Sequence, residues 1–298
     1  MKVPSLKMRI GLIIIFIFFG SLLLLDSCMQ FRMSSKEIDT YFSDRSVHAE
    51  QLSYREGNRV INYVLAGDDR LPLVVFVHGS PGSLSAFIHF LKDDTLLKNV
   101  QMITVDRPGF GASNFGHAEP SLEKQSQLLK PLLEKHKQGR HVILVGHSLG
   151  GPLIGRMAMD YPDLIDGLIM VAPSIDPDLE PNEWFRGPFA MPFLKLLLPR
   201  SIRASNDEIW KLKPQLQEMV SSWPSVRAKT IVIQGEKDSL VPAANADFAE
   251  KMMTQAPLEV VRVKDMDHFV PWSNPSLITS AIMKMVPHHD ATKGLSSQ

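Results

Sequence analysis

The sequence predicts an α/β fold, with a mostly parallel central sheet flanked by helices. Six compact apolar runs rich in β-branched residues recur along the chain, and helical patterns lie between them. Unbroken apolar runs are typical of central parallel strands, which are buried on both faces. Strands that alternate with helices indicate a doubly wound sheet. The chain has 298 residues, 44% of them hydrophobic, which is ample material for its core.

Two short strands are expected before this alternating part. Residues 51–56 read QLSYRE and residues 59–67 read RVINYVLAG, and the Gly57-Asn58 pair between them signals a hairpin turn at one edge of the sheet. The apolar runs that follow are LPLVVFVHG (71–79), VQMITVDRPG (100–109), HVILVGHS (141–148), GLIMVAPS (167–174), KTIVIQGEKD (229–238) and LEVVRVKD (258–265). The main helical patterns are SLEKQSQLLKPLLEKHK (121–137), GGPLIGRMAMDY (150–161), ANADFAEKMMTQA (244–256) and PSLITSAIMKMV (275–286).

A stretch of about fifty residues, 174–226, interrupts this alternation and shows no strand pattern. Its prolines, aromatic residues and FLKLLLP run indicate a mostly helical cap above the carboxyl ends of the strands, where open α/β sheets bind ligands. An ordinary pair of surface helices is the alternative, which the apolar density disfavours. We expect an apolar substrate to contact five cap residues: Trp184, Phe185, Phe189, Met191 and Phe193.

Residues 1–28 form an expected membrane-targeting segment. The basic opening MKVPSLKMR precedes an uncharged run, IGLIIIFIFFGSLLLL, as in export signals. This run of about 16 residues is marginal for crossing a bilayer, which takes about 20. Cys28, the single cysteine, follows in LLDSC and excludes an intramolecular disulfide. The arrangement resembles a bacterial lipoprotein signal with Cys28 as the lipidated residue, although Asp26 stands where small or apolar residues are usual.

The alternatives are an uncleaved N-terminal anchor and a solitary cysteine with no role. With either a lipid or an anchor, we expect the protein in the cell envelope, tethered to a membrane and facing outside the cytoplasm. Residues 29–50 are polar and predict a tether, and residues 287–298 predict a flexible tail with a solvated His288-His289 pair. Lys+Arg and Asp+Glu number 32 each, so no basic stripe predicts a nucleic-acid partner.

The stretch VILVGHSLGG (142–151) places Ser148 where an expected strand runs directly into an expected helix. Such a junction forces a tight turn, and the residue at its apex adopts a strained backbone conformation. Gly146 and Gly150 remove side chains that would collide there. The Leu149 N–H, at the amino end of the helix, would face an oxyanion formed on this side of the sheet. The pattern predicts that Ser148 is a nucleophile.

A serine nucleophile needs a base and an orienting carboxylate. Asp238 follows one expected strand in IVIQGEKDSLVP, and His268 follows the next in VVRVKDMDHFVPW. Asp176 and Asp207 also lie in suitable regions for the carboxylate, whereas the other histidines do not follow the last strand. The chain order serine, aspartate, histidine is the order of hydrolases built on a nucleophile elbow.

Together these motifs resemble the α/β-hydrolase superfamily from about residue 51 to residue 286. The oxyanion loop, the next loop, the elbow, the acid loop and the base loop of that superfamily resemble HGSPGS (78–83), DRPGFGAS (106–113), GHSLGG (146–151), GEKDSLVP (235–242) and DHFVPWSNP (267–275). The resemblance implies that the Ser80 N–H is the second oxyanion donor beside that of Leu149. Dehalogenases and epoxide hydrolases of this fold use an aspartate nucleophile, so Ser148 argues against both.

We therefore expect a serine hydrolase, a carboxylesterase that cleaves a small to medium apolar ester through an acyl-enzyme. An aminopeptidase- or amidase-like hydrolase is one alternative, although Ser80 and the GHSLGG elbow depart from the proline iminopeptidase pattern. A cofactor-free perhydrolase and a non-catalytic ligand-binding receptor on the same fold are the others. The expected mechanism requires neither a metal nor an organic cofactor.

Overall fold

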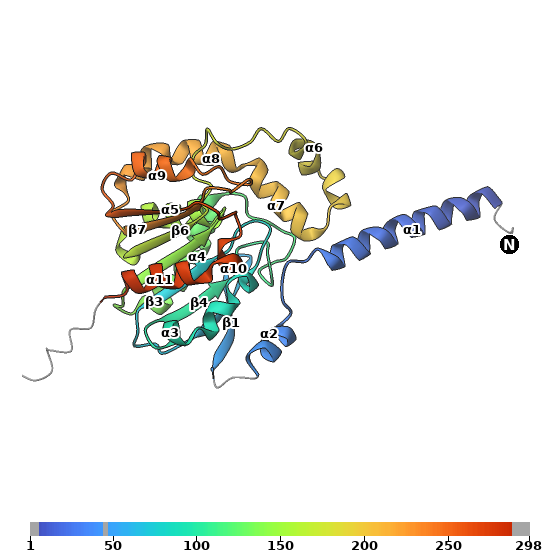
Figure 1. Ribbon diagram of the computed structural model, residues 1–298. Helices are drawn as coiled ribbons and strands as arrows, with labels where there is room; N and C mark the ends of the chain where they lie inside the picture. Colours follow the sequence, from blue (N-terminus) through green and yellow to red (C-terminus); the bar gives the residue numbers. More distant parts are fainter. Residues whose placement is uncertain (1–5, 44–46, 288–298) are drawn as a thin grey trace, which may run out of the picture.

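The computed structural model describes residues 6–43 and 47–287. Its centre is an eight-stranded sheet in the order β1-β2-β4-β3-β5-β6-β7-β8 (Figure 1). The strands are β1 (Ala49–Glu56), β2 (Arg59–Ala66), β3 (Leu73–Val77), β4 (Gln101–Val105), β5 (Val142–His147), β6 (Gly167–Val171), β7 (Lys229–Gly235) and β8 (Leu258–Val263). β1 and β2 pair antiparallel, β2 pairs antiparallel with β4, and all further pairings are parallel. The predicted parallel sheet with an antiparallel edge is confirmed.

The unbroken apolar runs form the middle of this sheet. β3, β5 and β6 are buried along their whole length, because helices cover both faces. One face packs against α4 (Leu122–Lys137), α5 (Gly150–Asp160) and α9 (Asn245–Met252). The other packs against α2 (Ser35–Phe42), α3 (Asp94–Leu97) and α11 (Pro275–Met285). Short turns of helix complete the domain: η1 (Leu84–Ala86), η2 (Ile88–Lys92), η3 (Pro162–Leu164) and α10 (Val270–Ser273).

The segment between β6 and β7 is helical, and we call residues 174–226 the cap. It contains α6 (Arg186–Ala190), η4 (Leu194–Leu197), α7 (Arg200–Trp210), α8 (Leu212–Met219) and η5 (Val220–Ser225). Figure 1 shows the cap along one side of the sheet, with α6 and the start of α7 at the end from which α1 projects. Leu212 and Leu216 of α8 are buried in the core that α4 and α5 also join. The inner side of the cap is thus part of the domain.

The N-terminal part of the chain has more structure than its composition predicted. α1 (Leu6–Cys28) has 23 residues and, among the described helices, is the one long and apolar enough to cross a membrane. Residues 29–50, expected to be an irregular tether, include α2, which begins with a capping box between Ser34 and Glu37. A helix of two turns is too short to show a clear apolar period in the sequence. The predicted tail lies, apart from residue 287, outside the described residues.

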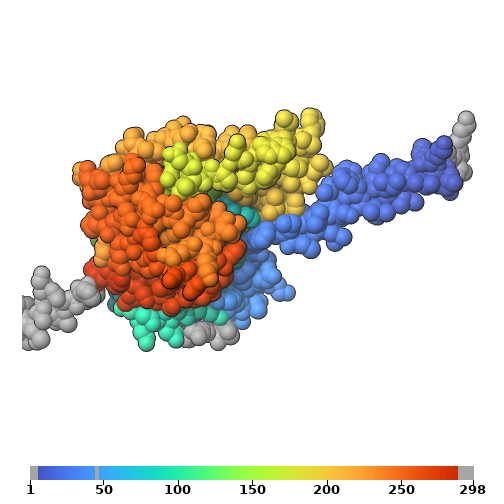
Figure 2. Space-filling view, turned by 45° about the horizontal axis from the view of Figure 1, so that its top comes forward, coloured from blue at the N-terminus to red at the C-terminus, as the bar shows by residue number. Residues whose placement is uncertain are grey.

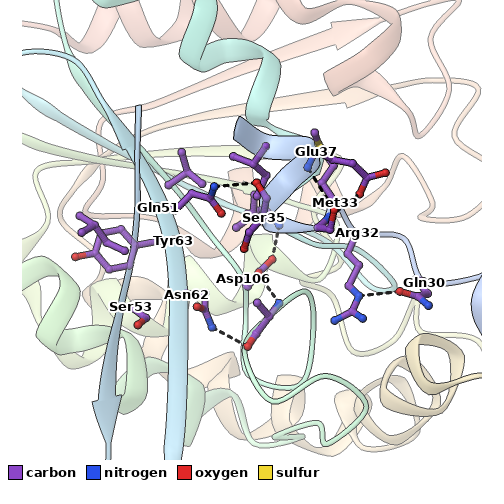
Figure 3. A pocket seen from close by; sticks show the side chains of 16 residues that line it. Gln30, Arg32, Met33, Ser35, Glu37, Gln51, Ser53, Asn62, Tyr63 and Asp106 are labelled. Carbon is purple, nitrogen blue, oxygen red and sulfur yellow. Dashed lines mark hydrogen bonds between the residues drawn. The ribbon is translucent and has the colours of Figure 1, made fainter. Parts of the chain in front are cut away.

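The segment just after α1 lies against the edge of the sheet. Arg32 donates to the Gly111 carbonyl at 2.9 Å, and Gln51 of β1 donates to the Ser35 carbonyl at 3.0 Å. Between this segment and β1–β2 is a polar cavity of about 440 Å³, with Asp106 in its wall (Figure 3). The Asp106 carboxylate accepts backbone N–H groups on two sides and holds the adjacent loops together. These contacts fix where the chain leaves α1 relative to the domain.

Candidate active site

Ser148 occupies the turn between β5 and α5. Its φ is 54°, in the left-handed region that a serine rarely adopts. A side chain on Gly146 would collide with the Gly150 carbonyl, and one on Gly150 would collide with the Val77 carbonyl. The strand and helix can therefore approach only because both positions are glycine. The Ser148 N–H donates to the Val171 carbonyl at 2.9 Å, which fixes the turn against β6.

Asp238 and His268 meet at the carboxyl ends of β7 and β8. The His268 Nδ1–H donates to Asp238 Oδ2 at 2.7 Å, and both side chains are buried. The other carboxylate oxygen, Oδ1, accepts the N–H groups of Leu240 at 2.9 Å and Val241 at 2.8 Å. Burial raises the pKa of Asp238, but the hydrogen bonds from His268 and the loop outweigh it, so the net pKa lies below its usual value. The carboxylate is therefore ionised and orients the imidazole.

The two other candidate carboxylates are bound elsewhere. Asp176 accepts the N–H of Asp178 in its own loop at 2.9 Å. Asp207, on α7, lies 3.8 Å from the Lys195 amino group. Of the three aspartates considered from the sequence, Asp238 is the one that the structure brings to His268.

His147 holds the base loop against the elbow. Its Nε2–H donates to the His268 carbonyl at 2.9 Å, which places the two rings 4.7 Å apart. Burial, with a smaller contribution from the charge of His268, lowers the pKa of His147 to about 3. His147 is therefore a neutral hydrogen-bond donor, and His268 is the imidazole beside Ser148 that is oriented by a carboxylate.

The loop of residues 78–83, which contains the expected oxyanion donor Ser80, is held by Arg107. This buried side chain donates through Nε to the His78 carbonyl at 2.8 Å and through Nη2 to the Gly79 carbonyl at 2.9 Å. Its guanidinium also binds the Glu208 carboxylate at 2.7 and 3.0 Å. Ser80 donates its hydroxyl to Glu208 at 2.9 Å. The first three residues of the loop are therefore tied to one ion pair.

Glu208 belongs to α7, so the same ion pair joins the cap to the catalytic edge of the sheet. Gln125 of α4 adds a hydrogen bond to Glu208 Oε1 at 2.8 Å. The Arg107 and Glu208 side chains are almost completely buried. The sequence does not indicate Glu208, because a glutamate in a helical stretch is normally exposed and its partner is 101 residues away. Only the tertiary structure brings the two together.

Two cavities meet at Ser148 and His268. The first, which we call the aromatic cavity, has a volume of about 410 Å³ and mostly apolar walls. Its larger side chains are Phe31, Pro81, Leu240, Phe269 and Trp272. The second, the cap cavity, has about 390 Å³ and is also lined by Ser80 and Leu149, the two expected oxyanion donors. On the cap side its walls are Ser174, Glu180, Pro181, Glu183, Arg186, Ile202, Ser205, Ile209 and Leu212.

The cap residues expected to contact substrate line neither cavity. Trp184, Phe185, Met191 and Phe193 are exposed on the outside of the cap, and Phe189 is partly exposed. The residues that do line the aromatic cavity are not among those predicted from the sequence. Leu240, Phe269 and Trp272 could have been found, because they lie within four residues of Asp238 or His268. Phe31 carried no signal, because it reaches the site only through the docking of the segment after α1.

Cys28, the expected lipidation site, is exposed at the end of α1. In the described part of the chain, no group of three or more histidine, cysteine, aspartate or glutamate side chains is placed to hold a metal ion.

Comparison with known proteins relates most of the chain to one family. The model of the Alpha/beta hydrolase family matches residues 74–281. An sn-1-specific diacylglycerol lipase from Mus musculus is 33% identical over 132 residues, which are 44% of this chain and 42% of that protein. Epoxide hydrolase 3 from Xenopus tropicalis is 29% identical over 156 residues, 49% of this chain and 41% of that protein. The chain therefore matches less than half the length of these curated relatives.

Solved structures extend the likeness to nearly the whole chain. A membrane phospholipase A, a bacterial virulence factor, has a TM-score of 0.63 and 14% sequence identity. The comparison covers 94% of this chain and 98% of that one. At this identity the similarity concerns the fold alone.

Proposed function

The chain belongs to the alpha/beta hydrolase family, and on this premise we propose that it is a serine hydrolase that cleaves an apolar carboxylic ester with Ser148, His268 and Asp238. The observation that carries the proposal is the hydrogen bond from His268 Nδ1–H to Asp238 at 2.7 Å. It selects the tautomer whose Nε2 has a free lone pair. His268 and Ser148 line the same two cavities, so we assign this nitrogen as the base that accepts the proton of the serine hydroxyl.

In the proposed reaction, His268 Nε2 takes the Ser148 proton while Oγ attacks the ester carbonyl. The tetrahedral intermediate collapses, and His268 returns the proton to the departing alcohol. Water then attacks the acyl-enzyme by the same route and releases the acid. Asp238 stabilises the imidazolium that forms in each step. The net reaction consumes one water and yields one alcohol and one carboxylic acid.

The backbone N–H groups of Ser80 and Leu149 are the proposed oxyanion donors. Both residues border the cap cavity together with Ser148. Leu149 stands at the amino end of α5, whose dipole favours a negative charge there. The Glu208–Arg107 ion pair keeps Ser80 in place through the Ser80 hydroxyl. One such donor contributes roughly 2.7–4 kcal/mol to transition-state stabilisation in comparable sites.

An acyl ester is favoured over other substrates by two observations. The aromatic cavity is mostly apolar, and its volume of about 410 Å³ lies in the range of small-molecule binding sites. Two similar proteins carry the names diacylglycerol lipase and membrane phospholipase A. Epoxide hydrolase 3 is also similar, but the epoxide hydrolases of this fold attack with an aspartate, and Ser148 stands at that position here.

The test is labelling of the full chain in detergent with a fluorophosphonate probe, beside its Ser148→Ala variant. We expect the wild type alone to be labelled, and to hydrolyse p-nitrophenyl esters faster than the matched anilides. Preference for the anilides would indicate the amidase-like alternative, and turnover that requires hydrogen peroxide would indicate a perhydrolase. A folded wild type that is neither labelled nor active on any ester would contradict the proposal and leave a binding role.

We also propose that α1 tethers the domain to a membrane outside the cytoplasm. The Asp26 carboxylate, which departs from the lipoprotein pattern, accepts hydrogen bonds from the Arg200 backbone N–H at 2.7 Å and from its guanidinium at 2.6 and 2.9 Å. This partner favours a retained anchor over cleavage before Cys28. Mass spectrometry of the protein extracted from membranes distinguishes an intact α1 from a lipid-modified Cys28 at the N-terminus.

A further inference from the structure

The outer surface of the cap exposes an unusual number of large apolar side chains. We call this surface the outer cap face, and it comprises Trp184, Phe185, Met191, Phe193, Leu194, Leu196 and Leu197. Phe193 is 87% exposed, Trp184 75% and Leu196 62%. Single exposed apolar residues are common, but a contiguous group of this kind marks an interaction surface.

The outer cap face lies at the end of the domain from which α1 projects. In Figure 2 the yellow cap surface ends beside the base of the blue helix, and Figure 1 shows α6 and the start of α7 at the same place. Arg200, three residues after η4, binds Asp26 near the end of α1. Ser201 donates its hydroxyl to the Met29 carbonyl. These contacts hold the last turn of α1 beside the outer cap face.

We propose that the outer cap face docks on the lipid bilayer that α1 enters. The membrane is the occupant because α1, which is long and apolar enough to cross a bilayer, is held beside this face by the Asp26–Arg200 ion pair. A bilayer that contains α1 therefore also contacts η4. If the anchor is instead a lipid on Cys28, cleavage removes Asp26, and the hydrogen bond from Ser201 to Met29 alone holds the anchored end beside this face.

The position of the aromatic cavity extends the inference to the substrate, and this part rests on the proposed function. Phe31, half exposed, lines that cavity together with Ser148 and His268. It lies three residues beyond α1, so the cavity borders the segment that leaves the membrane. An acyl chain that leaves the bilayer beside α1 can therefore enter the cavity without crossing water. The geometry points to a membrane-resident ester with a long acyl chain, that is, a lipid of the glyceride or phospholipid class.

Docking is tested by spin labels on the full chain in phosphatidylcholine vesicles. Cys28 is the single cysteine, so a Cys28→Ser background allows one label at a time. The test position is Leu196→Cys; Phe16→Cys in α1 is the lipid reference, and Asp69→Cys, exposed in the turn between β2 and β3, is the water reference. We expect the label at position 196 to be accessible to oxygen and shielded from a water-soluble nickel complex, as the label at position 16 is.

Two outcomes would overturn docking. A label at 196 that meets the nickel complex as freely as the label at 69 would show that the face stays in water. Spin–spin broadening at 196 that disappears on dilution with unlabelled chain would show that a second copy covers the face instead. Both results are independent of catalysis, so they are distinguishable from a failure of the proposed function.

The substrate part is tested with the double variant Leu196→Glu/Leu197→Glu and two esters. We expect hydrolysis of p-nitrophenyl palmitate in vesicles to fall about tenfold, since a loss of 1.4 kcal/mol corresponds to that factor. Hydrolysis of water-soluble p-nitrophenyl acetate should be unchanged. Equal rates of the variant and the wild type on the palmitate would overturn delivery from the membrane. Failure of the wild type on both esters would instead overturn the proposed function.

Discussion

The two sides of the cap distribute polar and apolar residues in opposite ways. On the inner side, α7 contributes Glu208 to a buried ion pair with Arg107, and Ser80 and Gln125 bind the same carboxylate. On the outer side, the outer cap face exposes aromatic rings and leucines. In most helical insertions the apolar side chains face inward and the charges face water. In the part of this cap nearest to α1, that distribution is partly reversed, with a charged pair inside and apolar side chains outside.

The difference teaches what each side contributes. A buried ion pair adds little net stability, because desolvation offsets the attraction, but it imposes one geometry. Here that geometry is the position of the oxyanion loop relative to the cap. The outer cap face adds little to folding, because its side chains stay exposed, and so it is free to serve a surface outside the chain. In our proposals, the inner side therefore positions the loop of Ser80, and the outer side positions the molecule on the membrane.

The largest effect is expected at the catalytic edge that the inner side covers. Asp238→Asn should lower kcat about 10⁴-fold, because the amide favours the wrong imidazole tautomer and cannot stabilise the imidazolium. Steady-state kinetics with a p-nitrophenyl ester measures this. Asp265→Asn is the matched control: that carboxylate is exposed and pairs with Lys237 at 2.8 Å, so activity should stay unchanged. A decrease of less than tenfold for Asp238→Asn would mean that another carboxylate orients His268.

The largest loss of stability is expected when one partner of the inner ion pair is removed. Arg107→Met leaves the Glu208 carboxylate buried without its counter-charge and should lower the free energy of unfolding by about 3–5 kcal/mol. Denaturant titration of the full chain in detergent measures the loss. The double variant Arg107→Met/Glu208→Leu should recover most of it, because no charge then remains buried. If the double variant is no more stable than the single one, the pair contributes packing rather than charge balance.

The free energy of unfolding should also fall in acid, because His147 is buried in its neutral form. The pKa of His147 is about 3 in the folded protein and about 6.5 in the unfolded chain. Between these values the unfolded state binds a proton that the folded state does not, so the free energy of unfolding decreases as the pH falls. The slope for one histidine reaches about 1.4 kcal/mol per pH unit. His147→Gln should reduce the slope by one proton, whereas an unchanged slope would assign the acid sensitivity elsewhere.

The smallest effect on stability is expected at the outer cap face. Leu196→Glu should change the free energy of unfolding by no more than about 0.5 kcal/mol, since the side chain is already 62% exposed. Leu216→Glu, on the buried side of α8, is the matched comparison and should be strongly destabilising. Thermal or denaturant unfolding in detergent measures both. A large loss for Leu196→Glu would show that the outer cap face packs within the protein, which removes the contrast between the two sides.

The parts of the site that follow strands could be predicted from the sequence. The turn at Ser148 depends on two glycines within two residues, and Asp238 and His268 come directly after the last two strands. Parallel strands end at one edge of a sheet, so their loops meet there without further information. The hairpin at β1 and β2 was equally local, because the Gly57-Asn58 turn specifies it. Residues close together in the chain are therefore sufficient to predict these features.

The cap shows where such reasoning fails. Its helical character was predicted, but the sequence does not say which side of the insertion faces the sheet. The aromatic residues are expected at the substrate because apolar side chains usually turn inward, yet they are exposed, and the cap's buried contacts are made by Leu212, Leu216 and the charged Glu208. The Glu208 carboxylate can be buried there only because the buried Arg107 side chain, just after β4, supplies its counter-charge. Neither residue indicates the other in the sequence.

The sequence by itself determined the mostly parallel sheet, the elbow at Ser148 and the presence of an apolar segment before the domain, because each depends on residues close together in the chain. Only the tertiary structure decided that Glu208 binds Arg107, that Phe31 borders the aromatic cavity and that the outer cap face lies beside α1. These contacts join segments far apart in the chain. Their energies depend on burial and on the partner, and no local pattern encodes either.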